Sequence, residues 1–484
     1  MNPIQFGTDG WRAIIAEDFT FANVARVAGA LAAYYRQAGE TRPIVVGYDR
    51  RFASEEFGRR VARVLAGAGL PVLFCTSYAP TPAISLLLVK EKAGGAVVIT
   101  ASHNPAEYNG VKIKGDFGGP VTPELTAEVE KILRAQMEAG EEPALCDYAE
   151  AVAKKKIVEV DAVPGYQAAI ESFVNVEAIR RAGLRVVVDA LYGAGSRVLA
   201  GVLEKWGMDV TEFHAEYNPG FGGLHPEPIA PNLEFLGKKV KELNADVGLA
   251  TDGDADRIGI VDENGAFIGT QAAFALLFMH LVEDRRMSGA VAKACSSTSM
   301  LDKLARKYNL PVYETRVGFK WVCDLMIDPG KNVLLGGEES GGYGLRGHVP
   351  ERDAGLVALL FLEMMAQRRA SVTQLLRQLY EKVGPHAFLR IDVRTTEERK
   401  QSALRKLANY PPKAFAGVKV ERVDTKDGYK LYLANGGWVL VRPSGTEPLL
   451  RTYCEAPSDA ACKEILAAVH KALLAVFGRR RGGR

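Results

Sequence analysis

Three aspartates at alternate positions are the residues of this sequence best suited to hold a metal ion. Asp252, Asp254 and Asp256 lie between two apolar runs in ADVGLATDGDADRIGIVDE, residues 245–263. Alternate side chains of an extended chain point to the same side, so the three carboxylates can converge on one cation. Such oxygen ligands suit Mg²⁺, which takes few protein ligands and keeps positions open for phosphate oxygens. Because three unpaired carboxylates would repel one another, we expect a magnesium loop here, with a solvated acidic turn as the alternative.

The same segment also has the spacing of a calcium-binding EF-hand, but that interpretation fails. Asp252, Asp254, Asp256 and Glu263 fit positions 1, 3, 5 and 12 of such a loop. Position 6, where the sharp turn needs glycine, is Arg257. The flanking runs are also strand-like, whereas an EF-hand places its loop between two helices.

A serine follows another strand-like run, in GAVVITASHNPAEYNGVK, residues 95–112. The run ends at Thr100, so Ser102 and His103 emerge at the carboxyl end of a strand, where open α/β sheets bind their ligands. A serine hydroxyl is a weak nucleophile unless a base or a metal assists it. Because His103 and Lys112 could manage protons or charge beside it, this loop is a candidate nucleophilic site.

Two local structures are compatible with the serine loop. Asn109-Gly110 favours a tight turn that returns the chain and brings the next lysine to the same rim. Alternatively, Ser102 and Asn104 only cap a helix that begins at Pro105.

Donors for an anion are gathered near the C-terminus in VRPSGTEPLLR, residues 441–451. Arg442 offers a planar fork of N–H groups that suits phosphate. Ser444 and Thr446 add hydroxyls, and Gly445 allows backbone N–H groups to approach an anion closely. A bare turn between a strand and a helix is the alternative, which explains the glycine but not the number of donors.

Two further glycine-rich segments give weaker indications. LGGEESGG, residues 335–342, exposes acidic and hydroxyl acceptors that suit sugar hydroxyls, although such turns are common on protein surfaces. YGAGS at residues 192–196 begins like a dinucleotide-binding fingerprint, but Val198 stands where the third glycine belongs. We therefore expect a plain strand-to-helix turn after residue 191.

These motifs sit on segments whose patterns predict alternating strands and helices. A helix is expected at residues 55–65, and short buried strands at residues 43–47, 70–74, 96–100, 184–190, 246–250, 258–261 and 331–335. Three similar α/β blocks therefore fill the chain to roughly residue 370. After Gly384-Pro385 a smaller α+β domain is predicted, with strands at residues 388–393, 418–423, 429–433 and 438–442 and helices at 397–407 and 459–477.

Length, charge and cysteine content restrict the classes of protein. A chain of 484 residues is too long for one core, so roughly two to four domains are expected. The formal charge of +3, from 61 basic and 58 acidic residues, argues against a broad nucleic-acid or membrane footprint. Six scattered cysteines without CxxC spacing favour buried thiols in a reducing compartment. With no signal-like start and no apolar stretch of membrane-spanning length, we expect a cytoplasmic protein.

Taken together, the motifs resemble those of the α-D-phosphohexomutase family. The segments that carry the resemblance are FGTDGWR at 6–12, TASHNP at 100–105, DGDADR at 252–257, GEES at 337–340 and RPSGTEP at 442–448. The resemblance runs almost end to end and implies an α/β protein of four domains around a central cleft. Three similar mixed α/β sandwich domains would carry the serine, metal and sugar loops, and a TATA-binding-protein-like α+β domain would bind phosphate. We place these domains at residues 1–150, 157–262, 263–370 and 384–484.

The resemblance also implies a role for each motif. Ser102 would carry a phosphoryl group and would hold Mg²⁺ together with Asp252, Asp254 and Asp256. The residues around the reacting phosphate would be Arg12, His103, Lys112 and Arg257, with Lys112 as a candidate general acid or base. The residues that contact the substrate would be Gly318, Lys320, Glu338, Ser340, Arg442, Ser444, Gly445 and Thr446.

The implied activity is isomerisation of hexose 1-phosphate and hexose 6-phosphate through a phosphoserine and a hexose 1,6-bisphosphate, which also serves as activator. Gly342 and Phe319 stand where many relatives acting on mannose or glucosamine phosphates have histidine, and GEESGG followed by GHVPERDAG is similar to the phosphoglucomutases. Glucose phosphates are therefore favoured, with mannose phosphates, dual specificity and then glucosamine phosphate as alternatives.

Two rival functions come from other classes: a magnesium-dependent sugar phosphatase that uses Ser102, and a non-catalytic sugar-phosphate sensor. In each case the expected partner is a small sugar phosphate, not nucleic acid or a membrane. Either a monomer or a homodimer is compatible with the sequence.

Overall fold

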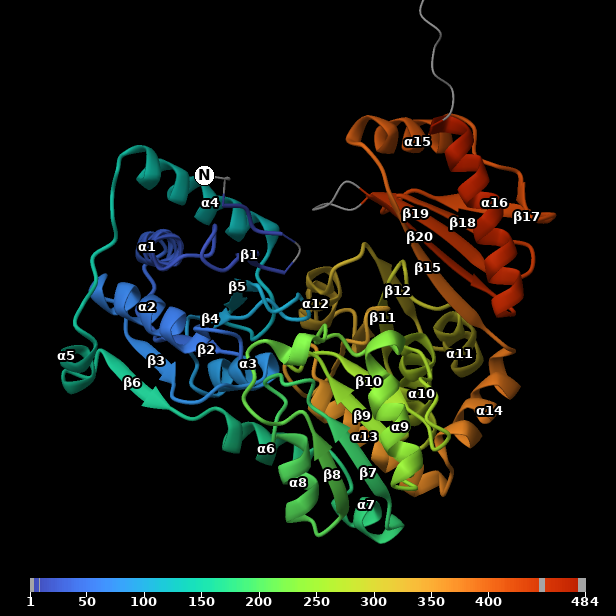
Figure 1. Cartoon of the computed structure of the whole chain (residues 1–484), viewed down its shortest axis with the longest axis horizontal. Helices are drawn as coiled ribbons and strands as arrows, with labels where there is room; N and C mark the ends of the chain where they lie inside the picture. The colour runs from blue at the N-terminus through green and yellow to red at the C-terminus, as the bar shows by residue number, and fades with distance from the viewer. Residues whose placement is uncertain (1–3, 8, 444–448, 478–484) are drawn as a thin grey trace, which may run out of the picture.

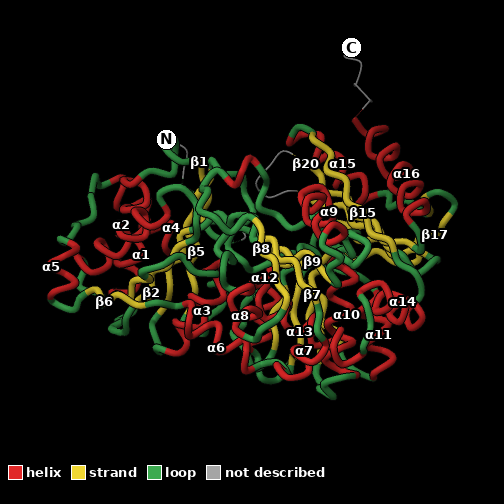
Figure 2. Tube along the Cα trace, turned by 60° about the horizontal axis from the view of Figure 1, so that its bottom comes forward, coloured by secondary structure: helices red, strands yellow, loops and turns green. Residues whose placement is uncertain are grey.

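The computed structural model, which describes residues 4–7, 9–443 and 449–477, shows four layered units (Figure 1). The first and fourth units stand on opposite sides of the molecule, and the second and third units join them at the base. Three units contain mixed sheets, and the fourth contains an antiparallel sheet. In Figure 2 the strands form central layers with helices packed outside them. This architecture confirms the predicted fold class.

The first unit is built on a six-stranded sheet of order β1-β5-β4-β2-β3-β6. Its strands are β1 (Trp11–Ile14), β2 (Ile44–Tyr48), β3 (Val72–Cys75), β4 (Gly95–Ile99), β5 (Tyr108–Gly115) and β6 (Ile157–Val160), and its helices are α1 (Phe21–Gln37), α2 (Ser54–Gly67), α3 (Thr81–Lys90), α4 (Pro123–Glu138) and α5 (Tyr148–Ala153). Both β2 and β4 are buried over their whole length because helices cover both faces of the sheet, which accounts for their unbroken apolar sequences.

The second unit holds the aspartate loop between two antiparallel strands, β9 and β10. Its sheet has the order β10-β9-β7-β8. The strands are β7 (Arg185–Asp189), β8 (Asp209–Phe213), β9 (Val247–Thr251) and β10 (Ile258–Val261); the helices are α6 (Val163–Ser172), α7 (Val176–Ala182), α8 (Leu199–Lys205) and α9 (Glu234–Glu242), with 3₁₀ turns at Phe221–Gly223 and Ala230–Leu233. Strands on both sides of the loop confirm that it is not an EF-hand.

The third unit contains a sheet of order β12-β11-β13-β14. Its strands are β11 (Ala290–Ala294), β12 (Val312–Thr315), β13 (Val333–Gly337) and β14 (Tyr343–Leu345), and its helices are α10 (Thr270–Glu283), α11 (Met300–Tyr308), α12 (Phe319–Ile327), α13 (Ala354–Arg368) and α14 (Val372–Val383). Helix α13 is buried along most of its length and belongs to an apolar core that includes residues of all three α/β units. These units therefore form one continuous body.

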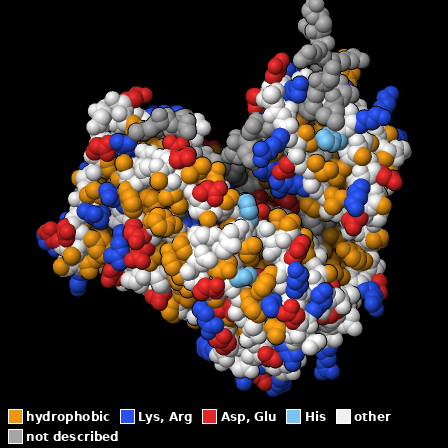
Figure 3. Space-filling model, in the orientation of Figure 1, with side chains coloured by type: hydrophobic (Ala, Val, Ile, Leu, Met, Phe, Trp, Pro, Cys, Tyr) orange, Lys and Arg blue, Asp and Glu red, His pale blue; other side chains and the backbone are white. Residues whose placement is uncertain are grey.

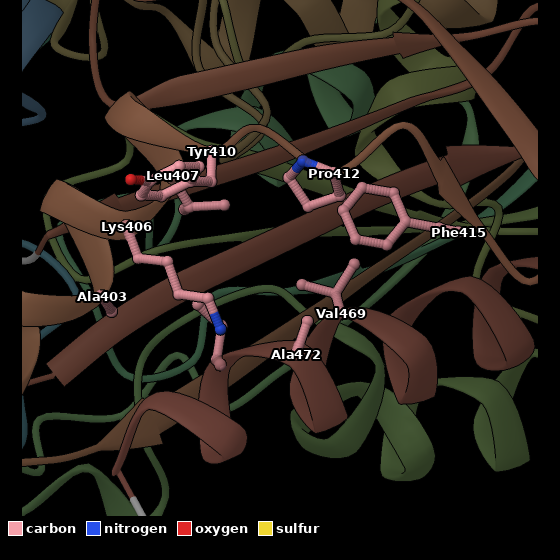
Figure 4. A pocket seen from close by; sticks show the side chains of 9 residues that line it. Ala403, Lys406, Leu407, Tyr410, Pro412, Phe415, Val469 and Ala472 are labelled. Carbon is pink, nitrogen blue, oxygen red and sulfur yellow. The ribbon is translucent and has the colours of Figure 1, made fainter. Parts of the chain in front are cut away.

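The fourth unit has its own core and a sheet of order β15-β20-β19-β18-β17-β16. Its strands are β15 (Ala387–Arg394), β16 (Ala414–Phe415), β17 (Val418–Asp424), β18 (Tyr429–Leu433), β19 (Trp438–Pro443) and β20 (Leu449–Ala456), and its helices are α15 (Glu397–Asn409) and α16 (Asp459–Phe477). A small apolar pocket lies between the two helices, lined by side chains such as Leu407, Phe415 and Val469 (Figure 4). None of the helices in the described ranges combines the length and hydropathy that crossing a lipid bilayer requires.

Three local expectations differ from the structure. Asn109-Gly110 does not form a turn but lies within β5, where a β-carbon on Gly110 would come 2.6 Å from the carbonyl oxygen of Thr100. Glycine is required there for close packing of strands. No helix begins at Pro105 either, since a turn leads directly into β5. Ser102 has a φ of 54°, outside the extended conformation of a helix cap.

The third difference concerns the start of the second domain, which the sequence placed at residue 157. In the structure residues 157–160 form β6, which pairs in parallel with β3 and extends the first sheet. Ile157 is buried against the core of the first unit. The chain through β6 therefore still belongs to the first unit, and the second domain begins after this strand.

Candidate active site

Loops from the first and second units meet at Ser102. Its side chain is fully buried, and its hydroxyl donates a hydrogen bond to Asp252 Oδ2 at 3.0 Å. The two residues come from sequence-distant strand ends, β4 in one sheet and β9 in the next. Figure 3 shows the molecular surface hollowed between the N-terminal and C-terminal units, with charged side chains of both signs along the hollow. The serine and aspartate loops thus share one site, as the sequence predicted.

The backbone at Ser102 is held in the left-handed region, with φ at 54°. Its N–H donates to Thr100 Oγ1 at 2.8 Å. On the other side lies Gly253 of the aspartate loop, where a β-carbon would overlap the Ser102 carbonyl oxygen. Glycine at 253 therefore allows the two loops to approach closely enough for the hydroxyl to reach the carboxylates.

The three aspartates form a site whose chemistry fits a divalent cation. Asp252, Asp254 and Asp256 are fully buried, and one ligand oxygen of each lies within 4.8 Å of the others. Within the described part of the chain, Oδ1 of Asp254 and Oδ1 of Asp256 are buried without a hydrogen-bond partner. Burial, then the charges of Asp256 and Asp254, raise the pKa of Asp252 well above its ordinary value. A bound cation would satisfy the unpaired oxygens and remove this cost.

Lys112 neutralises part of this acidic cluster. Its ammonium lies 2.8 Å from Asp254 Oδ2, 3.3 Å from Asp256 Oδ2 and 2.9 Å from Asp9 Oδ2. Burial acts to lower the pKa of Lys112, but the charges of Asp254, Asp9 and Asp256 outweigh it and raise the pKa above its ordinary value. Lys112 reaches this position from β5, because that strand leaves the serine loop antiparallel to β4 and places Lys112 opposite Val98, near the loop.

Arg352 and Asp9 belong to the site, although the sequence analysis did not identify them. Arg352 Nη2 lies 2.6 Å from Asp256 Oδ2 and 2.8 Å from Asp9 Oδ2. Its Nη1 is 3.6 Å from Glu338 Oε2, so one guanidinium contacts the metal loop and the sugar loop. Both residues stand in segments that were noticed, FGTDGWR and GHVPERDAG. Their charged side chains, inside segments already used for the resemblance, were the signal from which these two residues could have been predicted.

The other cationic residues predicted near the reacting phosphate also lie here. Arg12 Nη1 donates to Asn104 Oδ1 at 2.7 Å, and Arg257 Nη1 is 3.5 Å from Glu227 Oε1. His103 Nδ1 lies 3.5 Å from the Ser102 hydroxyl. Burial, followed by the charges of Arg257, Arg12, Lys112 and Arg51, lowers the pKa of His103 well below its ordinary value, so the imidazole is neutral at pH 7.

The sugar loop and the 318–320 segment come together in the third unit. Glu338 Oε1 accepts a hydrogen bond from Gly318 N at 2.9 Å. Burial, partly opposed by Arg352, raises the pKa of Glu338 to about 7. Lys320 follows at the start of α12 with its ammonium 5.3 Å from the Trp321 ring centre, and Ser340 is half-buried in the turn between β13 and β14.

Arg442 of the fourth unit is tied to the third unit through Asp427. Its Nε lies 3.2 Å from Asp427 Oδ2, and the same oxygen accepts from Val317 N at 3.0 Å. Asp427 therefore contacts both Arg442, the predicted phosphate residue, and Val317, which directly precedes the predicted substrate-contacting residue Gly318. The other predicted phosphate ligands, Ser444, Gly445 and Thr446, lie outside the described residues.

A buried serine beside three aspartates, in a molecule of four layered units, fits an enzyme of the sugar-phosphate mutase class, which transfers phosphoryl groups. The sequence matches the phosphoglucomutase/phosphomannomutase alpha/beta/alpha domains I, II and III at residues 3–140, 164–265 and 270–383, and the C-terminal domain at 391–472. The chain belongs to the α-D-phosphohexomutase family, as the resemblance implied, and is an isomerase of that type.

Individual relatives carry different substrate names. A phosphoglucomutase/phosphomannomutase of Thermococcus kodakarensis is 32% identical over 95% of this chain and 96% of its own. A phosphoglucosamine/phosphogalactosamine mutase of Sulfurisphaera tokodaii is 28% identical over 96% of this chain and 98% of its own. A crystal structure assigned as a phosphomannomutase of Thermus thermophilus has a TM-score of 0.85 and 32% identity, covering 98% of this chain and 99% of that one.

Proposed function

We propose that this enzyme interconverts glucose 1-phosphate and glucose 6-phosphate through a phosphoserine at Ser102. The observation that carries the proposal is the hydrogen bond from the Ser102 hydroxyl to Asp252, inside a buried cluster of three carboxylates. A phosphoryl group on that oxygen would project among Arg12, Lys112 and Arg257, which supply the positive charge that phosphoryl transfer requires.

Asp252, Asp254 and Asp256, together with a phosphoryl oxygen on Ser102, would hold Mg²⁺. When bound, the ion supplies charge neutralisation at the phosphoryl group. The carboxylates position it, and Lys112 balances the charge that remains on Asp254 and Asp256. His103, neutral and next to the serine oxygen, can accept or donate a hydrogen bond there without adding charge.

The proposed reaction conserves both phosphates. A free hydroxyl of the hexose monophosphate attacks the phosphorus on Ser102, the serine Oγ–P bond breaks, and a hexose 1,6-bisphosphate forms. The hydroxyl loses a proton while the departing Ser102 oxygen gains one. Lys112, the candidate general acid or base, would relay it by donating an ammonium proton to the serine oxygen and accepting the proton of the hydroxyl. The bisphosphate then turns end for end and returns its other phosphate to Ser102, and the same bisphosphate supplied from solution would activate dephosphorylated enzyme.

The fourth unit would hold the phosphate that does not react, through Arg442, Ser444, Gly445 and Thr446, while Glu338, Ser340, Gly318 and Lys320 contact the sugar. Both orientations of the bisphosphate place one phosphate at Ser102 and the other at this loop. The reaction therefore needs a second anion site that accepts either end of the sugar, and a guanidinium is suited to both.

Glucose is proposed because Gly342 stands where many relatives that act on mannose or glucosamine phosphates have histidine. A β-carbon on Gly342 would overlap the Arg352 side chain, whose guanidinium lies 5.4 Å from the Phe319 ring centre. Arg352 thus occupies the space that a histidine at 342 would need. Mannose phosphates, dual specificity and then glucosamine phosphate are the alternatives, in keeping with the names of the relatives.

The test is a comparison of kcat/KM for the 1-phosphates of glucose, mannose and glucosamine, with intact mass measured on the purified enzyme. We expect glucose 1-phosphate to be the best substrate and one phosphate to be present on wild-type protein but absent from Ser102→Ala. Release of inorganic phosphate without glucose 6-phosphate would indicate a sugar phosphatase instead. Binding of sugar phosphate without turnover, unchanged in Ser102→Ala, would indicate a sensor. A mass increase on Ser102→Ala would place the phosphoryl group elsewhere.

A further inference from the structure

The loop that carries Ser102 has little secondary structure of its own. Between the end of β4 at Ile99 and the start of β5 at Tyr108 the chain forms only turns and bends. Turns satisfy some of its carbonyl oxygens, since Asn104 N donates to Ala101 O and Tyr108 N donates to Pro105 O, each at 3.1 Å. Other buried carbonyls of the loop need a donor from elsewhere in the molecule.

That donor is the guanidinium of Arg51, which binds three carbonyl oxygens of the loop and the carbonyl oxygen of Tyr108, the first residue of β5. Nη2 donates to Ser102 O at 2.7 Å and to Asn104 O at 2.6 Å. Nη1 donates to Pro105 O at 2.7 Å and to Tyr108 O at 2.9 Å. The side chain is fully buried, so no solvent competes for these bonds.

Arg51 is itself fixed from two sides. Its Nε lies 3.3 Å from Asp49 Oδ2, and that aspartate also accepts from Arg51 N at 3.0 Å and from Ser54 Oγ at 2.9 Å. The ring of Phe221, from the second unit, lies 4.9 Å from the guanidinium carbon. A planar guanidinium held by a carboxylate and covered by an aromatic ring has little freedom to turn away from the loop.

The bond to Ser102 O bears on the conformation of the serine. A non-glycine residue in the left-handed region persists only where its surroundings hold it. The surroundings here are Thr100 at the Ser102 amide and Arg51 at its carbonyl. The conformation they hold is the one in which the hydroxyl reaches Asp252.

We propose that Arg51 is a positioning residue for phosphoryl transfer. It fixes three carbonyls of the serine loop and that of Tyr108, and thereby keeps Ser102 in the left-handed conformation that directs its oxygen to the carboxylate cluster. Arg51 contacts no substrate atom and acts through the loop. Lysine cannot replace it, because an ammonium presents its donors from a single point whereas the guanidinium forks toward two pairs of carbonyls. The inference rests on the proposed function.

The test compares Arg51→Lys with Arg50→Lys. Arg50 is also buried, but its bonds go to Ser196 and to Ala215 O, the latter at 2.8 Å, and its guanidinium stacks on Tyr78. Because misplacement of a reacting group by about 1 Å can cost 10²-fold, we expect kcat of Arg51→Lys to fall about 100-fold. KM should stay within about two-fold, since the phosphate and sugar contacts are intact. Arg50→Lys should keep kcat within about three-fold of wild type.

Hydrogen exchange of the amides in residues 102–107 gives a readout that does not depend on the reaction. Arg51→Lys should accelerate this exchange, and Arg50→Lys should leave it unchanged. Equal kcat losses in the two variants, or a raised KM with unchanged kcat in Arg51→Lys, would refute the positioning role. If Arg51→Lys does not fold, Asp49→Asn replaces it: kcat should fall with KM preserved, and wild-type kcat would refute the role.

Failure of the proposed function looks different. Wild-type protein that neither carries phosphate on Ser102 nor converts hexose phosphates would refute the mutase reaction, while the exchange data would still report whether Arg51 orders the loop. A mutase whose loop exchanges identically in all variants would refute the role of Arg51 alone.

Discussion

Asp254 combines two contacts that make it sensitive to a change of one charge. Its Oδ2 binds Lys112 and accepts from Thr81 Oγ1 at 2.6 Å, while its Oδ1 is the buried oxygen without a partner in the described structure. One carboxylate oxygen therefore bonds to protein groups, and the other is available to the proposed cation. An amide at this position keeps the shape but removes the charge.

We accordingly expect Asp254→Asn to lower kcat by about 100-fold or more, because a metal ion contributes several kcal/mol to charge stabilisation at the reacting group. Mg²⁺ affinity, measured by calorimetry, should fall as well. Unchanged turnover together with unchanged Mg²⁺ affinity would exclude Asp254 as a ligand.

Glu338 leads to a pH prediction. Burial raises its pKa to about 7, so the carboxylate becomes protonated as the pH falls through 7 and loses its negative charge as an acceptor for sugar hydroxyls. KM for the hexose phosphate should therefore rise below about pH 7 relative to Glu338→Gln, whose side chain does not titrate. The ratio of the two KM values removes the ionisation of the substrate phosphate, which both enzymes share. A pH-independent ratio would contradict this role.

At the scale of elements, the contact between the serine loop and the aspartate loop depends on a missing side chain. A methyl group at Gly253 would overlap the Ser102 carbonyl oxygen, so the two loops would have to separate. We expect Gly253→Ala to lower kcat about 100-fold while secondary structure is retained. Gly165→Ala, in α6 where a β-carbon meets only Lys90 Nζ at 3.9 Å, is the control and should keep kcat. Similar kcat values in both variants would show that the loops tolerate separation.

Sequence patterns predicted best the elements whose residues are determined mainly by burial or by a single motif. Apolar runs buried on both faces, such as β2 and β4, and the strands around the aspartate loop were located to within two residues. The Asn109-Gly110 pair was misinterpreted because two small turn-forming residues also suit a strand that must approach its neighbours closely. Local sequence does not show how near another strand will pass.

The site residues follow the same division. The serine, the three aspartates and Lys112 were predicted from motifs, and the structure brings them into contact. Arg352, Asp9 and Arg51 were not, because their importance arises from contacts across many residues of sequence, from Asp9 to Arg352 for example. Such contacts depend on how the units pack, which no single motif encodes.

At the scale of the whole molecule, the first and third units are joined by a fully buried ion pair between Lys114 and Glu351. The fourth unit meets the third through a separate buried patch, in which Cys295 packs with Trp438, Leu440 and Tyr453. Polar contacts beside this patch include Lys430 with Glu314 at 2.6 Å and Ser299 N with Glu455 at 2.9 Å. The three α/β units share a core, and the fourth has its own. Motion of the fourth unit over the cleft would therefore leave the shared core intact and would disturb only the contacts at this patch.

Arg442→Ala tests the role of the fourth unit. Loss of this guanidinium should raise KM about ten-fold or more, since a charge-assisted bond to phosphate is removed from ground state and transition state alike. Arg422→Ala, which removes an exposed guanidinium stacked 3.8 Å from the Tyr432 ring centre on the same sheet, should leave KM unchanged. A fall in kcat alone in Arg442→Ala would show that the residue acts in the chemical step instead.

The carboxylate of Asp427 lies 3.2 Å from Nε of Arg442, the residue proposed to bind the phosphate that does not react. Any anion arriving at the fourth unit must therefore compete with a resident negative charge. A singly charged ion such as chloride gains little by such an exchange, whereas a phosphate dianion brings enough charge to displace or share it. Asp427 would thus lower the affinity of this site for monovalent anions, which would protect the enzyme from inhibition by the abundant monovalent salts around it.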